Sequence, residues 1–74
     1  MKTNLTNIKT NQTGIINTVL DNPLITKLFE FGLLPGAQFK VVNIAPFKGP
    51  ISIIVNDTRI ALRQKEAKFI LVEY

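Results

Sequence analysis

The chain has 74 residues, a net charge of +4, and neither cysteine nor histidine. That length gives room for one domain with a small core. The two absences exclude a disulfide framework and a zinc site of the usual Cys/His kind, and they remove the commonest general base and the most reactive nucleophile. The charge favours an anionic partner, such as a nucleic acid, an acidic protein face or a membrane surface, although an ordinary solvated basic surface would give the same count.

The N-terminal segment, residues 1–12, is polar. It lacks the apolar stretch of a signal peptide, and no part of the chain approaches the ~20 apolar residues that a membrane helix needs. Leu5 and Ile8 are its only apolar residues after Met1, so we expect a loosely anchored arm that is pinned by these two side chains. We expect a cytoplasmic protein.

A strand and a helix are predicted next. Gly14 opens a β-branched, apolar stretch over residues 15–20, which indicates the first strand. An asparagine–proline pair then favours a helix start, and apolar residues at helical spacing predict one short amphipathic helix over residues 23–31. Gly32 is the expected C-terminal stop, because glycine adopts the left-handed conformation easily.

The middle of the chain alternates turns and strands. Pro35 and Gly36 predict a type II turn, because proline presets the first central position and glycine supplies the positive φ at the second. A strand is expected over residues 38–45. It is followed by a compact loop, residues 46–50, that begins and ends with proline.

Three further elements complete the predicted sheet. Residues 51–55 alternate between apolar and polar and indicate a half-buried strand. Residues 56–57 form a tight hairpin turn that leads into a strand over 58–62. Residues 63–67 suit a single helical turn, and residues 68–72 form the closing strand.

Together these elements predict one mostly β domain over residues 1–74, with about five short strands and one short helix after the first strand. A partly open barrel leaves few unpaired strand edges in so small a domain. The early helix favours an SH3-like barrel over an OB-fold, whose helix usually lies between strands three and four. The edges that stay unpaired would also allow a homo-oligomer.

The acidic residues give no catalytic pattern. Asp21 lies at a helix start, Asp57 in a hairpin turn, and the other three acids, Glu30, Glu66 and Glu73, are expected on solvent-facing surfaces. No two of them have the spacing of a carboxylate pair, and there is no phosphate-binding, dinucleotide-binding or EF-hand motif. We therefore predict that the chain is not an enzyme, and we expect no cofactor and no metal.

Binding of single-stranded nucleic acid is the alternative function. Basic residues become more frequent toward the C-terminus, at Arg59, Arg63, Lys65 and Lys68. Such a track binds single strands best when aromatic side chains are free to stack on bases. Four aromatic residues are expected in the core, namely Phe29, Phe31, Phe39 and Phe69, which leaves only Phe47 and Tyr74. Nucleic acid is therefore not the expected partner.

Phe47 is the strongest candidate for a contact residue. The flanking prolines would hold it rigidly, and rigid aromatic side chains make good binding anchors. The alternative is that Phe47 folds back and caps one end of the barrel. Arg59 and Arg63 are the only arginines, so an arginine finger would come from one of them, unless both are ordinary surface residues. The predicted contact surface comprises Pro46, Phe47, Lys48, Gly49, Pro50, Arg59 and Arg63.

Four segments in order resemble one known family. Residues 28–36 (LFEFGLLPG) resemble the leucine-glycine-x-x-proline-glycine signature of FeoA proteins, the small cytoplasmic component of bacterial ferrous iron uptake. Residues 45–51 (APFKGPI) are similar to the alanine–proline loop of that family, and Gly14 with the two following isoleucines matches its upstream strand. The closing pattern of the family is similar to residues 60–63, 66–67 and 70–72.

The resemblance implies an SH3-like barrel that binds no iron itself and acts on FeoB, a membrane permease with a GTP-binding domain. The chain would reach the membrane only through that partner. We therefore expect a non-enzymatic accessory or regulatory protein of ferrous iron uptake. Lys27 stands where the family frequently has arginine and joins the predicted contact surface. The family motif implies structural roles for Gly14, Gly32, Pro35 and Gly36.

Overall fold

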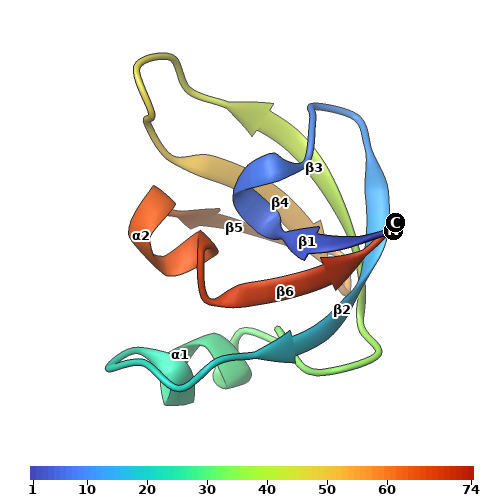
Figure 1. Cartoon of the computed structure of the whole chain (residues 1–74), viewed down its shortest axis with the longest axis vertical. Helices are drawn as coiled ribbons and strands as arrows, with labels where there is room; N and C mark the ends of the chain where they lie inside the picture. Colours follow the sequence, from blue (N-terminus) through green and yellow to red (C-terminus); the bar gives the residue numbers. More distant parts are fainter.

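Six antiparallel strands form one curved sheet, and the computed structural model describes all residues 1–74 (Figure 1). The order in the sheet is β1-β6-β2-β3-β4-β5. The strands are β1 (Lys2–Asn4), β2 (Thr13–Val19), β3 (Gln38–Ile44), β4 (Ile51–Val55), β5 (Thr58–Leu62) and β6 (Ile70–Glu73). The connections contain two short helices and one 3₁₀ turn, α1 (Ile25–Glu30), α2 (Gln64–Ala67) and η1 (Leu5–Asn7).

One apolar core fills the inside of the curved sheet, with 16 buried side chains in a single cluster. β4 shows how the sequence builds it. Ile51, Ile53 and Val55 are fully buried, whereas Ser52 and Ile54 point away from the core. This alternation is the pattern that predicted the strand, since successive side chains of a strand point to opposite faces.

Two irregularities in pairing bend the sheet. The register between β2 and β6 shifts between Ile16 and Thr18, and the register between β3 and β4 shifts between Val41 and Asn43. A bulge places an extra residue in one strand and increases its local bend and twist. The sheet can therefore wrap around a small core.

The start of α1 differs from the prediction of a helix over residues 23–31. The Asn22 side-chain oxygen accepts a hydrogen bond from the Leu24 N–H at 2.9 Å. Leu24 itself has φ −105° and ψ 10°, so the helix proper begins at Ile25. Asn22 thus stabilises a turn ahead of the helix, which shortens α1 by two residues at this end.

The end of α1 follows the prediction. Gly32 has a φ of +95°, and the Leu33 N–H reaches back to the Leu28 carbonyl at 3.0 Å. This is the Schellman arrangement, in which a left-handed glycine ends the helix. Gly36 has a φ of +91°, as the type II turn predicted at residues 34–37 requires.

Residues 1–12 are not the loosely held arm that was predicted. Leu5 and Ile8 are buried as expected, with 0% and 1% of their surface exposed. β1, however, pairs along its whole length with β6, in the register Lys2↔Glu73. The N-terminal segment is therefore an integral edge of the sheet, and β1 is a strand beyond the five predicted.

Candidate functional site

The loop at residues 46–50 is a closed turn between β3 and β4. The Ala45 N–H donates to the Pro50 carbonyl at 3.0 Å, and the Gly49 N–H donates to the Pro46 carbonyl at 3.1 Å. A Cβ atom on Gly49 would lie 2.7 Å from the Cβ of Ala45, so only glycine fits there without a shift. The backbone of the loop is therefore fixed without help from the two side chains at its tip.

Phe47 and Lys48, at the tip, both have a left-handed backbone, with φ of +59° and +57°. Positive φ at both central positions is the pattern of a type I′ turn, which favours asparagine and glycine there. For other residues this conformation costs roughly 1–2 kcal/mol each. The Phe47 side chain is 100% exposed. The alternative in which Phe47 caps the barrel is therefore wrong.

The structure brings some predicted contact residues together and separates others. The Gln64 side chain donates to the Gly49 carbonyl at 3.1 Å, which places the neighbouring Arg63 beside the loop. Arg59 is exposed on β5. Lys27 belongs to α1, which lies at the opposite end of the molecule from the β3–β4 loop (Figure 1). Lys27 is therefore separated from Phe47 by the length of the barrel.

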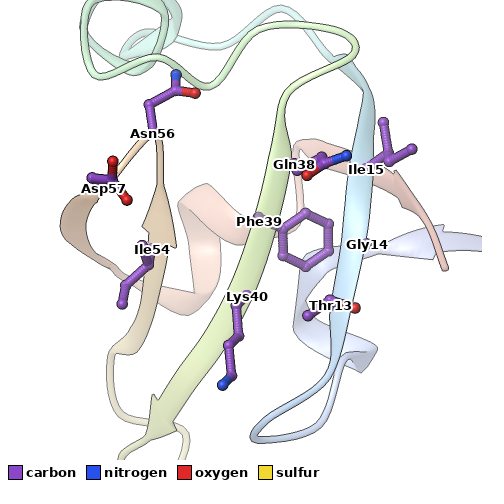
Figure 2. A pocket seen from close by; sticks show the side chains of 9 residues that line it. All are labelled: Thr13, Gly14, Ile15, Gln38, Phe39, Lys40, Ile54, Asn56 and Asp57. Atoms are coloured by element: carbon purple, nitrogen blue, oxygen red, sulfur yellow. The ribbon is translucent and has the colours of Figure 1, made fainter.

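A shallow hollow of about 570 Å³ lies on the outer face of β2, β3 and β4. Figure 2 shows the nine residues that line it: Thr13, Gly14, Ile15, Gln38, Phe39, Lys40, Ile54, Asn56 and Asp57. None of the predicted contact residues is among them. Its lining mixes amide, hydroxyl, lysine and carboxylate groups with isoleucine, and it holds no histidine or cysteine that could act as a base or nucleophile.

Gly14 is the one member of the hollow that belongs to the family motif. A Cβ atom on Gly14 would lie 2.8 Å from the Phe39 ring and 2.7 Å from the Glu73 carbonyl oxygen. Gly14 and Phe39 are cross-strand partners, and the ring lies next to the glycine (Figure 2). The glycine thus makes room for an aromatic side chain. The rest of the hollow comes from three strands and has no local signal in the sequence.

Glu66 is buried, contrary to the prediction that it faces solvent. Only 9% of its surface is exposed, and its Oε1 accepts a hydrogen bond from the Arg63 N–H at 3.1 Å. A glutamate that reaches back in this way satisfies a free amide at the start of a helix. Glu66 therefore has a structural role at the start of α2.

Three aromatic residues expected in the core are partly exposed. Phe29, Phe31 and Phe69 expose 38%, 42% and 37% of their surface, whereas Phe39 is buried as predicted. α1 has only six residues and buries Leu28 alone. The flanks of its apolar face, with Phe29 and Phe31, stay partly in contact with solvent.

The fold contains no group of three or more His, Cys, Asp or Glu side chains that could hold a metal ion. No helix combines the length and the apolar character that crossing a membrane would require. What the surface does offer is a rigid loop with an exposed aromatic tip and an arginine beside it.

These features define a small SH3-like barrel domain with a surface suited to binding. The family model described as "FeoA domain" matches residues 3–74, and the chain belongs to the FeoA family.

Solved structures agree with this assignment. An iron uptake regulatory protein (FeoA) is 32% identical, with a TM-score of 0.88, and the match covers 99% of this chain and 96% of that one. FeoA from Chlorobium tepidum is 30% identical, with a TM-score of 0.86 and coverage of 95% and 68%. Stenotrophomonas maltophilia FeoA, solved with zinc and described as an SH3 domain protein proposed to activate ferrous iron transport, is 27% identical, with a TM-score of 0.85 and coverage of 95% and 88%.

Proposed function

We propose that this chain is a non-enzymatic, cytoplasmic accessory protein of bacterial ferrous iron uptake, which binds a FeoB-type permease through the loop at residues 46–50 and Arg63. Membership of the FeoA family supports the link to ferrous iron transport. The exposed Phe47 on its strained turn is the observation that supports binding as the mode of action. Strained backbone conformations cluster at functional sites.

Phe47 would act as the anchor of the contact. Full burial of an exposed phenylalanine side chain on a partner contributes roughly 1.5–3 kcal/mol. The hydrogen bonds that close the loop exist before binding, so little further conformational entropy would be lost. Lys48 follows Phe47 at the tip, and Arg63 directly precedes Gln64, which is hydrogen-bonded to the loop, so both charges would select an acidic surface on the permease.

Uptake of ferrous iron in cells that lack this gene and express the permease tests the proposal. We expect uptake to fall in those cells and to recover with the wild-type gene. Phe47→Ala should restore less uptake, while its melting temperature stays at the wild-type value, because the side chain is fully exposed.

Phe31→Ala is the matched control, because it removes a partly exposed phenyl ring at the C-cap of α1, and α1 lies at the opposite end of the molecule from the loop (Figure 1). It should restore uptake more fully than Phe47→Ala at equal protein levels. Unchanged uptake in the deletion strain would refute the proposed function. Full restoration by Phe47→Ala would refute the assignment of the loop.

A further inference from the structure

β5 is an open edge of the sheet. It is the last strand in the sheet order and pairs on one side only, with β4. Its register runs without a shift from Val55↔Thr58 to Ile51↔Leu62. No backbone hydrogen bond outside the strand ladder involves residues 58–62. The opposite edge, β1, has only three residues.

The hairpin fixes which backbone groups of β5 are unpaired. β4 and β5 are joined by the two-residue turn at residues 56–57, and in such a hairpin the residues that flank the turn exchange both their hydrogen bonds. Paired and unpaired positions alternate along an antiparallel ladder. The N–H and C=O groups of Arg59 and Ala61 therefore point away from β4. Two donors and two acceptors are available at this edge.

The side chains along this edge follow a simple pattern. Arg59, Ala61 and Arg63 are exposed, whereas Ile60 and Leu62 between them are buried. Arg63 keeps an extended backbone, with φ −72° and ψ 156°. At about 3.3 Å per residue, the two arginines stand about 13 Å apart on the outer face, with a methyl group between them. The backbone of Arg63 is used by Glu66, so Arg63 can contribute only its side chain.

From this edge we infer that β5 binds an extended acidic segment of a protein partner as an additional strand. The backbone of the segment pairs with Arg59 and Ala61. Residues directly opposite in neighbouring strands share a face. A carboxylate side chain therefore lies opposite each arginine, and a large apolar or aromatic side chain covers Ala61. Arginine suits this role, because its guanidinium can hold a carboxylate with two hydrogen bonds.

This inference rests on the proposed function only in taking a protein as the partner, and it names the chemistry of one segment of that partner.

A second copy of the chain fits the edge less well. Two β5 strands paired about Ile60 would place their Arg59 side chains on one face as diagonal neighbours, roughly 7–8 Å apart. Each copy also carries a net charge of +4, so both effects oppose self-association.

The test uses the purified protein and a short synthetic peptide. Every second residue of the peptide is threonine, and the residues between the threonines are glutamate, tyrosine and glutamate, in that order. Binding is followed by amide resonances and amide hydrogen exchange. We expect the Arg59 and Ala61 amides to shift and to exchange more slowly. Arg59→Ala and Arg63→Ala should each weaken binding by up to about fivefold, the range of an exposed ion pair. Added salt should weaken it further.

Lys2→Ala is the matched control for charge, because Lys2 is exposed on β1, the strand at the other end of the sheet order. It should leave the affinity unchanged. A peptide of the same composition, with its carboxylates moved by one position to the other face, should bind at least fivefold more weakly.

Three results would overturn the inference: equal binding of the two peptides, shifts confined to the hollow of Figure 2, and protection of the Arg59 and Ala61 amides in concentrated protein without peptide. Because the permease is absent from the experiment, failure here would leave the outcome of the uptake experiment unaffected.

Discussion

At the residue scale, the two residues at the tip of the loop at residues 46–50 adopt a backbone conformation that residues of their type disfavour. Phe47 and Lys48 are poorly suited to positive φ. The turn forms nevertheless, because the hydrogen bonds at its base hold it and the missing side chain of Gly49 leaves room beside Ala45. The reversed handedness points the Phe47 side chain into solvent. Any replacement that tolerates positive φ should therefore relieve strain.

Lys48→Gly tests this strain. It should raise the free energy of unfolding by about 0.5–1 kcal/mol, because relief of the left-handed penalty exceeds the entropy that glycine adds to the unfolded chain. The measurement is equilibrium denaturation by urea. Lys40→Gly in β3 is the control, and it should lower stability, because glycine weakens a strand. A loss of stability in Lys48→Gly would show that the turn is unstrained.

Predictions for single residues were right where the backbone conformation requires one particular residue type. Gly32 and Gly36 are of this kind. The direction of Phe47 stayed open, because proline and glycine predict a turn but not its handedness. The burial of Glu66 was missed, because the residue it caps is an arginine, which is not a typical start of a helix.

At the scale of elements, hydrophobic periodicity located β2, β3, β4, β5 and β6 to within about two residues, as is usual for strongly patterned segments. It could not locate β1, because Lys2–Asn4 is short and polar and pairs with residues at the other end of the chain. It also overestimated how much of the apolar face of α1 is buried. Periodicity shows which face is apolar but not how much of it the neighbouring sheet covers.

Leu5→Ala measures how firmly the N-terminal segment is held. Because Leu5 is fully buried, the substitution should cost about 2–5 kcal/mol of unfolding free energy, through lost burial and the cavity left behind. The measurement is urea denaturation followed by circular dichroism. Lys9→Ala, at an exposed position of the same segment, should change stability by less than about 0.5 kcal/mol. A comparably small effect of Leu5→Ala would restore the description of residues 1–12 as a loose arm.

At the scale of the whole molecule, the predicted contact residues divide between two regions. The loop at residues 46–50 and Arg63 adjoin each other, whereas Lys27 lies at the far end of the barrel. Spacing along the chain could not show this, because the distance between a loop and a helix depends on how the sheet curves. The hollow of Figure 2 depends on the same curvature and was missed for the same reason.

Zinc should not stabilise this protein, although a FeoA relative was solved with zinc. The chain has no cysteine or histidine, and its carboxylates do not cluster. A ligand that binds the native state raises the melting temperature. Thermal unfolding with added zinc chloride should therefore match unfolding with added chelator. A saturable rise in melting temperature would reveal a site that the fold does not show.

The position of β6 between β1 and β2 has a consequence for folding during synthesis. β6 comes after the other five strands in the chain, and it joins β1, which precedes them, to the rest of the sheet. While the ribosome still holds residues 70–73, β1 has no partner and β2 lacks one of its two neighbours. Contacts between such distant parts of a chain form slowly, because a long loop must close first. The nascent chain therefore cannot reach its native state until residues 70–73 have left the ribosome, and its unpaired strands stay available to other chains until then.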